Sequence, residues 1–237
     1  MRKEENCIIL EPGDTLYRYD LGNNLPNDWS AEYSSPEYYS HNYGRKNVIG
    51  AFFFFENKQA AKETLAQAIY NQKVKNKEYD CGTITYCNVT NDIKLLDLTT
   101  GLFNCSNIIS VLYDLDIDVV SNKFYNYQKR LPYSSIGNAV KALSSDDYHI
   151  KLNAAKEINE FFLYCPRLLG QSLTDFNNGV DFKKILNEKG FEGYVFNESP
   201  TSDTYCLFKA DKISNPKHEE IYIESDCKPP VFHVIDF

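Results

Sequence analysis

Short runs of apolar residues, each bounded by turn-forming residues, recur over the first hundred positions of the chain. Residues 15–19 alternate between polar and apolar side chains directly after a Pro-Gly-Asp turn at 12–14, which predicts an early strand. Residues 48–55 are almost entirely apolar and predict a buried strand. Residues 81–90 and 93–98 alternate and are rich in residues that favour strands, so they predict two more.

A helical pattern follows the second of these strands. Asn57 can cap its first turn, because an asparagine side chain accepts a hydrogen bond from an N–H that the helix leaves unpaired. The apolar residues beyond it recur at the spacing of one helix face: Ala61, Leu65, Ala68 and Ile69. The lysine-rich stretch at 72–77 marks the expected end of this helix.

The middle of the chain is predicted to be mostly helical over residues 99–170. The clearest helical patterns within it are at 138–143 and 152–163. A further short helix is predicted at 181–188. The Lys-Gly pair at 189–190 closes this last helix, since glycine readily adopts the left-handed conformation of a helix C-terminus.

Two closing strands complete the pattern, at 193–197 and 204–209, with a polar loop at 198–203 between them. The order is therefore strands, a helix, strands, a helical middle and a closing strand pair. Such an order is typical of the α+β class rather than of a regularly alternating α/β fold. Glycine and proline are scattered singly and no linker is evident, so we expect one domain over 1–237.

The charge balance argues against some classes of partner. The chain of 237 residues carries 25 Lys and Arg against 33 Asp and Glu, a formal net charge of −8. We therefore expect no nucleic-acid-binding face and no anionic membrane surface as a partner, although a local basic pocket is compatible with this balance. Arginine is scarce, which a lysine-favouring codon bias would explain; the five are Arg2, Arg18, Arg45, Arg130 and Arg167.

Cysteine and histidine usage argues against a metal site. The 7 cysteines include no CxxC pair, and none of the 4 histidines lies at a ligand spacing from a cysteine, so we expect no metal. No run approaches the roughly 18 apolar residues of a membrane span, and no secretory core is present. We expect a soluble protein that is cytoplasmic, or an effector secreted or injected into the cytosol of a target cell. The sequence contains none of the phosphate-loop, dinucleotide-binding, zinc-protease and serine-hydrolase motifs.

Four remaining motifs occur in an order that resembles the RES-domain family and the wider ADP-ribosyltransferase-like superfamily. The first two are Leu16-Tyr17-Arg18 and Gly44-Arg45-Lys46-Asn47. The third is the apolar strand at 51–55, followed by Ala60-Ala61-Lys62-Glu63. The fourth is GFEGYVFNES at 190–199, followed by YCLF at 205–208. The resemblance implies an ADP-ribosyltransferase-like split β-sheet core, with residues about 99–170 as a mostly helical insertion.

The resemblance also implies that the chain binds NAD⁺ as its substrate. An arginine fork meets phosphate oxygens at two points, as lysine does not, so Arg18 and Arg45 are the candidates for the diphosphate or the nicotinamide ribose. A flat aromatic wall would hold the nicotinamide ring. The candidates for that wall are Tyr17, Tyr43 and Phe54.

Cleavage of the nicotinamide N-glycosidic bond develops positive charge on the ribose, which a carboxylate stabilises. Glu63 corresponds to the family position for this carboxylate, and Glu198 lies between the predicted closing strands. Ser199 matches the family serine, which is expected to hydrogen-bond the ribose or the amide. Thr204 stands where many ADP-ribosyltransferases carry a glutamate, and no ExE motif occurs, so modification of arginine is disfavoured.

Each candidate also has a simpler interpretation that the residues alone leave open. Arg18 can be an outward strand residue, Arg45 a solvated loop residue and Glu63 an exposed helix residue. The four phenylalanines at 52–55 can form a packed core strand, and Glu198-Ser199 a polar turn.

A second hypothesis is a non-catalytic protein-binding module on the same fold. Residues 21–44 are rich in Asn, Ser, Pro and Tyr and predict a long loop, and its aromatic-rich part at 29–43 suits an interface. Under either hypothesis the partners to consider are a protein target and an antitoxin or immunity protein.

Overall fold

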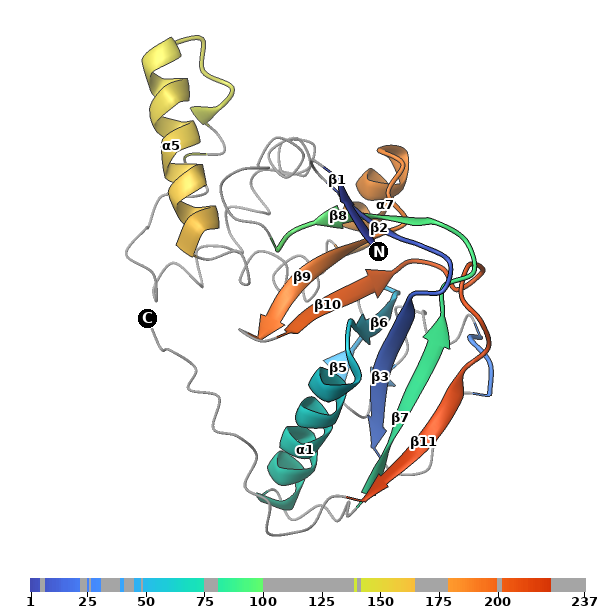
Figure 1. Cartoon of the computed structure of the whole chain (residues 1–237). Coiled ribbons are helices and arrows are strands. Elements are labelled where there is room, and N and C mark those ends of the chain that lie inside the picture. The colour runs from blue at the N-terminus through green and yellow to red at the C-terminus, as the bar shows by residue number, and fades with distance from the viewer. Residues whose placement is uncertain are drawn as a thin grey trace.

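The computed structural model describes residues 1–4, 7–21, 25, 27–30, 39–40, 45–47, 49–74, 81–99, 139, 142–164, 179–199 and 202–222 (Figure 1). Most of the predicted helical middle, including all of 100–138, lies outside this set. The described elements in chain order are β1 (Arg2–Glu4), β2 (Cys7–Leu10), β3 (Thr15–Leu21), β4 (Tyr39–Ser40), β5 (Arg45–Lys46), β6 (Phe52–Phe55), α1 (Lys58–Val74), β7 (Cys81–Asn88), β8 (Ile93–Asp97), α5 (Tyr148–Tyr164), α7 (Gly179–Glu188), β9 (Gly193–Ser199), β10 (Ser202–Leu207) and β11 (Lys217–Tyr222).

Nine of the described strands form one sheet in the order β1-β2-β8-β9-β10-β6-β3-β7-β11, and β4 pairs with β5 separately. The pairs are antiparallel except for the parallel pair of β8 and β9. Strands and helices occupy separate stretches of the chain, so the fold is α+β, as predicted.

A four-residue link between β2 and β3 forces this sheet to bend. Four strands separate β2 from β3 in the sheet, which corresponds to roughly 24 Å in a flat sheet. The chain from Leu10 to Thr15 spans at most about 18 Å when fully extended. The sheet must therefore curl, and β3 then faces back toward β2 (Figure 1).

Three such links meet at one end of the curled sheet, which we call the closed end. They are the β2–β3 link, the β7–β8 link and the segment from β10 to β11. The N–H of Gly13 donates to the Val89 carbonyl at 2.9 Å, and the N–H of Val89 donates to the Asp14 carbonyl at 2.8 Å. Val89 also forms a bridge with Ile213. Gly13 has φ of 98°, which explains why glycine is required in this turn.

The inner side of the curl, which we call the concave face, holds an apolar cluster contributed by both halves of the sheet. Strand β2 supplies Ile8 and Leu10, while β7 supplies Cys87, although five strands lie between them in the sheet. Trp29 packs edge-on against Phe52 and Phe54 in the same cluster, with ring centroids 6.0 and 5.3 Å away. The curl therefore buries the concave face against itself.

Helices cover the opposite side of the sheet, which we call the helix-covered face. Helix α1 packs Leu65 and Ile69 against Tyr19 and Ile84. Helix α7 packs its own apolar residues in a second cluster with β9 and β10. Among the described residues, no helix is both long enough and apolar enough to cross a bilayer.

Several local predictions are confirmed. The Asn57 side chain accepts a hydrogen bond from the Ala60 N–H at 2.8 Å, so it caps α1. Gly190 has φ of 78° and closes α7. Its N–H donates to the Asn187 carbonyl, and the N–H of Phe191 donates to the Leu186 carbonyl. This pair of bonds is the expected glycine C-terminal motif. The helix predicted at 152–163 is present as α5.

The strand predicted at 48–55 begins four residues later than expected, at Phe52. A turn precedes it: the Gly50 N–H donates to the Asn47 carbonyl, and Gly50 has φ of 61°. The Asn47 side chain holds the turn by donating to the Ala51 carbonyl at 2.8 Å. Lys183 of α7 donates to the Gly50 carbonyl. These contacts turn the backbone where the apolar pattern alone predicts an extended run.

The polar loop predicted at 198–203 is also wrong in extent. Strand β9 continues to Ser199 and β10 begins at Ser202, and these two residues pair with each other. The register shifts at the next pair, because Asp203 pairs with Asn197 and Glu198 is the extra residue of a bulge. Five described strands had no predicted counterpart: β1, β2, β4, β5 and β11.

We predict that Gly193→Ala destabilises the protein by about 3 kcal/mol, because the added Cβ would lie 1.9 Å from the Cys206 carbonyl oxygen in the adjacent strand. Gly190→Ala is the matched control. Its Cβ would meet nothing within 4 Å, so only the cost of the left-handed backbone remains, about 1 to 2 kcal/mol. Urea unfolding of both variants measures the difference, and equal losses would show that strands β9 and β10 separate to admit the methyl group.

Candidate functional site

Opposite the closed end, β9 ends at Ser199 and β10 begins at Ser202; we call this end of the two strands the open end. Strand β6 stops at Phe55, and its one register pair with β3 joins Phe55 to Tyr17. Strand β3 runs on to Leu21, and β10 begins at Ser202, on the other side of β6. From Arg18 to Leu21, β3 pairs with β7 but has no register pair with the antiparallel β6 among the described residues, so the two halves of the sheet are not joined along this stretch.

Arg18 lies on the concave face at this point, one residue beyond the pair. Its Nη2 donates to Asp20 Oδ1 at 2.7 Å, and the two side chains are 15% and 7% exposed. Residues two apart on a strand share a face, so strand geometry itself places Asp20 beside Arg18. Burying a carboxylate is costly unless it is paired, and Arg18 supplies the pairing charge.

Two further strands extend this polar site. The Thr85 hydroxyl of β7 donates to Asp20 Oδ2 at 2.9 Å, and Thr85 Oγ1 lies 3.0 Å from His218 Nδ1 of β11. Thr85 is fully buried, and His218 is half-buried. We call these four side chains the Arg18 row.

A buried thiol borders the Arg18 row on its closed-end side. Cys87 lies two residues beyond Thr85 on the concave face, among apolar neighbours. Burial raises the pKa of Cys87 to about 12, although the positive charge of Arg18 acts in the opposite direction. The thiol therefore stays protonated at neutral pH, which argues against a nucleophilic role for Cys87.

The other half of the sheet carries carboxylates near the open end, on β8 and β10. Asp97 of β8 has a fully buried side chain, with Lys3 Nζ at 3.0 Å and the Thr99 hydroxyl at 2.6 Å. Burial acts to raise the pKa of Asp97, but the bonds from Thr99 and Lys3 outweigh it and hold this pKa below its ordinary value.

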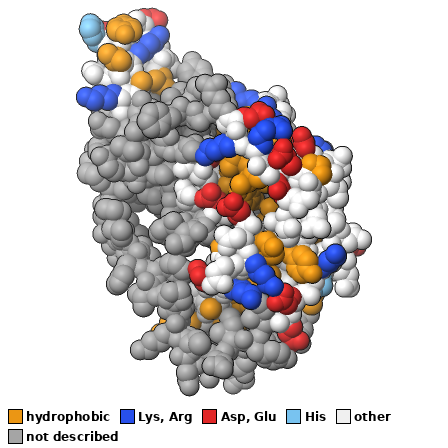
Figure 2. Space-filling model, viewed as in Figure 1, with side chains coloured by type: hydrophobic (Ala, Val, Ile, Leu, Met, Phe, Trp, Pro, Cys, Tyr) orange, Lys and Arg blue, Asp and Glu red, His pale blue; other side chains and the backbone are white. Residues whose placement is uncertain are grey.

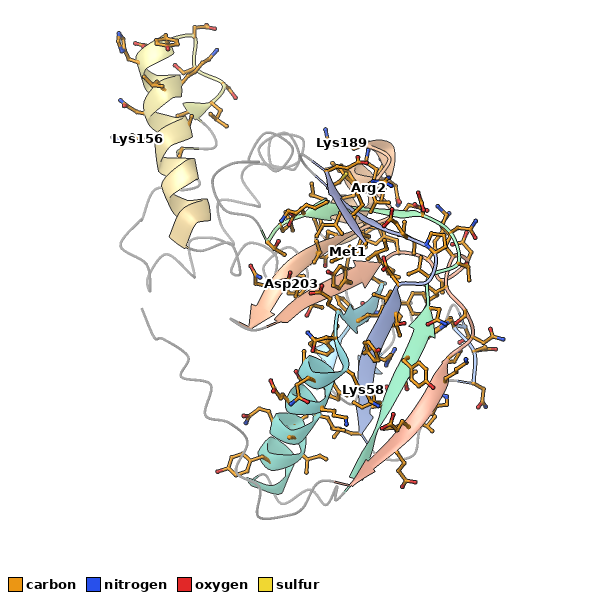
Figure 3. All side chains as sticks on the ribbon, viewed as in Figure 1. Met1, Arg2, Lys58, Lys156, Lys189 and Asp203 are labelled. Carbon is orange, nitrogen blue, oxygen red and sulfur yellow. The ribbon has the colours of Figure 1, made fainter. Side chains whose placement is uncertain are left out.

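Asp203, labelled in Figure 3 at the start of β10, has the opposite shift. Burial raises its pKa, and the negative charges of Glu56 and Asp97 raise it further. Asn197 opposes this effect by donating to Asp203 Oδ1. Burial and the same acidic neighbours also raise the pKa of Tyr205. The concave face is thus apolar toward the closed end and ionic at the open end.

The structure does not bring Glu63 and Arg18 together. Helix α1 packs on the helix-covered face, whereas Arg18 is on the concave face. Ala61 and Leu65 point toward the sheet, which directs Glu63 to the outer side of the helix. There Glu63 accepts a hydrogen bond from Gln59, one turn earlier, at 2.8 Å. Glu63 therefore lies where its simpler interpretation, a residue on the outer surface of a helix, places it.

The aromatic candidates are also separated from Arg18. Tyr17 precedes Arg18 on the strand, so it points to the helix-covered face, where it packs against the α1 cluster with its ring 6.3 Å from that of Tyr86. Phe54 is on the concave face but is 0% exposed and packs within the core. These positions match the core-strand alternative for the phenylalanine run.

Arg45 lies in β5, paired with β4, and nothing is described of its side chain. Tyr43 lies outside the described residues. Glu198 and Ser199 form the open-end terminus of β9; the register through β10 and β6 places this end on the Leu16 side of Tyr17, away from Asp20. Ligand contacts by these residues stay predictions.

Sequence reasoning missed Asp20, Thr85 and His218. The spacing of Arg18 and Asp20 on an expected strand was a usable signal, because an arginine and an aspartate on one face can pair. No comparable signal existed for Thr85 and His218, since β11 had not been predicted and its partner strand lies far away in sequence.

The described residues contain no group of three or more His, Cys, Asp or Glu side chains arranged to hold a metal ion. On the face that Figure 2 shows, acidic and basic side chains of the described residues are interspersed. On the concave face, Arg18 is thus a cation aligned by a buried carboxylate.

Comparison with known proteins yields one structural likeness. No family model matches the chain, and no curated protein matches its sequence. One chain of the crystal structure of the M. tuberculosis MbcT–MbcA toxin–antitoxin complex is similar, with a TM-score of 0.36 and 9% sequence identity. The match covers 90% of this chain and 87% of that chain. A likeness at this level establishes neither a family nor an activity.

We predict opposite effects from removing the two aspartate charges at the open end. Because the folded pKa of Asp97 is lowered, its carboxylate adds stability above the unfolded pKa, and this is lost as pH falls through the folded value. Asp97→Asn should therefore cost about 2 kcal/mol at pH 7 and much less near pH 2.

Asp203→Asn is the matched variant with the reverse sign. Its folded pKa is raised, so ionisation lowers stability as pH rises through that value. Neutral asparagine should raise stability at pH 7 by less than about 1 kcal/mol. Urea unfolding at several pH values measures both variants. Losses of equal size in the two variants at pH 7 would contradict these assignments.

Proposed function

We propose that the chain is a NAD⁺-consuming enzyme of the bacterial toxin or effector type, which cleaves the bond between nicotinamide and ribose. The observation that carries the proposal is the place of Arg18. This arginine of the first family-like motif is half-buried on the concave face, aligned by a buried carboxylate, where the sheet divides. The ordered motifs of the sequence supply the identity of the substrate.

Arg18 suits an anionic ligand group better than a surface arginine does. A partly desolvated guanidinium interacts more strongly with phosphate oxygens, and its alignment reduces the entropy that binding would cost. In this proposal Arg18 meets the NAD⁺ diphosphate. Arg45 is the second candidate for the same group.

Cleavage breaks the bond between ribose C1 and the nicotinamide nitrogen, which leaves with the bonding electrons. A carboxylate at the open end would stabilise the positive charge left on the ribose. Glu198, in the last residues of β9, is the preferred candidate because Glu63 is on the outside of α1, a helix that covers the face opposite Arg18. Ser199 would hydrogen-bond the ribose or the amide. The acceptor is water, phosphate or a macromolecular target.

The binding-module hypothesis has less support from the described part of the proposed interface. The Trp29 side chain is held in place and is not an adaptable interface residue, because its ring packs on the core and its indole N–H donates to the Ser214 carbonyl at 2.7 Å. A protein target, or an antitoxin or immunity protein, remains a proposed partner of the enzyme.

We predict that Arg18→Lys weakens NAD⁺ binding by about tenfold or more, since lysine cannot make the two-point contact of the guanidinium fork. Arg2→Lys is the matched control. Arg2 lies on β1, is 51% exposed and pairs only with surface glutamates among the described contacts. Calorimetry with NAD⁺ gives the dissociation constants. If both variants bind NAD⁺ as the wild type does, Arg18 is not part of the site.

We predict that Glu198→Gln lowers the rate of nicotinamide release by about 100-fold while NAD⁺ binding changes little, because its charge acts mainly in the transition state. Glu188→Gln, on the exposed surface of α7, is the matched control. Free nicotinamide is measured with and without phosphate and cell lysate, and mass spectrometry of the lysate detects ADP-ribose adducts. A wild type that binds NAD⁺ but releases no nicotinamide would favour the non-catalytic module.

A further inference from the structure

Three of the four residues of the Arg18 row share one rung of the sheet across three neighbouring strands. Arg18 of β3 is the register partner of Thr85 of β7, and Thr85 is the register partner of His218 of β11. Adjacent strands lie about 4.8 Å apart, so the backbones of the outer two residues are about 10 Å apart. A residue distant in sequence is thus linked to Arg18 through side-chain contacts.

Hydrogen-bond chemistry determines the direction of each contact in this row. Asp20 is an acceptor only, because its carboxylate pairs with Arg18. The Thr85 hydroxyl has one proton and donates it to Asp20 Oδ2. Its oxygen must then accept from His218, so His218 Nδ1 carries the proton. In the neutral imidazole, Nε2 is consequently the basic nitrogen.

The same contacts limit how Asp20 can hold Arg18. A carboxylate and a guanidinium commonly form two parallel bonds. Here Thr85 occupies Oδ2, and the contact with Arg18 is the single bond from Nη2 to Oδ1. Thr85 thus helps to orient the Asp20 carboxylate that Arg18 meets, and the hydroxyl proton of Thr85 is directed toward Asp20 because His218 donates from the other side.

We propose that Thr85 and His218 are positioning residues for Arg18: their hydrogen bonds orient the Asp20 carboxylate, and its Oδ1 in turn aligns the guanidinium toward an anionic ligand. The identity of that anion as NAD⁺ rests on the proposed function. The row itself can be tested without any ligand.

Nitrogen-15 NMR at pH 8 tests the row in the unliganded protein. The wild type should show His218 protonated on Nδ1, and Thr85→Val should shift the proton to Nε2 and move the Arg18 Nε–H resonance, which Arg18→Lys identifies. Thr85→Ser keeps the hydroxyl and should preserve both signals. Protonation of wild-type His218 on Nε2, or an Arg18 resonance unmoved by Thr85→Val, would overturn the proposal.

Calorimetry with NAD⁺ tests the consequence for binding. Thr85→Val should weaken binding about fivefold, the effect of one lost hydrogen bond, with recovery in Thr85→Ser. Thr15→Val is the matched control, because Thr15 also bonds from β3 to β7, with Asn88 Oδ1 at 3.1 Å, but at the closed end. It should bind NAD⁺ as the wild type does. Equal weakening in both valine variants would indicate general loosening of the β3–β7 pair and overturn the positioning role.

His218→Ala provides a second variant, since His218 is half-buried on the outermost described strand and its loss is less disruptive than a change at buried Thr85. It should move the Arg18 resonance in the same direction as Thr85→Val. An unmoved resonance would overturn the part assigned to His218. If both NMR results are as expected but the wild type does not bind NAD⁺, the proposed function is wrong, whereas the positioning of Arg18 by Thr85 and His218 is still supported.

Discussion

The shortness of the β2–β3 link is the constraint on which the rest of the structure depends. Four residues cannot cross the width of four flat strands, so the sheet must fold over its own concave face. The β7–β8 link imposes the same condition, and backbone hydrogen bonds at Val89 join the two links. One end of the curl is thereby closed.

The curl then divides the concave face into two chemical environments. Near the closed end, side chains from both halves bury one another, and contacts such as that of Trp29 on Phe54 exclude water. Along Arg18–Leu21, β3 pairs with β7 and no longer with β6, and polar groups replace the apolar cluster. Polar and charged groups can be retained there only when they are paired, which Arg18 with Asp20 and Lys3 with Asp97 are.

Strand geometry also decides which candidate residues can act together. Tyr17 and Arg18 belong to one motif in the sequence but point to opposite faces, and Glu63 lies on a helix that covers the face opposite Arg18. The partners that Arg18 acquires come instead from its own strand and from β7 and β11. A motif read along the chain therefore joins residues that the sheet separates.

Local patterns of the sequence determined the elements whose stability is local: the capped start of α1 at Asn57, the glycine end of α7 and most central strands. They did not reveal β11, whose charged pattern is stabilised by pairing with β7, or the turn before Phe52, which Asn47 and Lys183 hold. The sequence by itself determined the α+β class and singled out Arg18 as a candidate. Only the tertiary structure decided its partners, because curling and register set which distant side chains share a face.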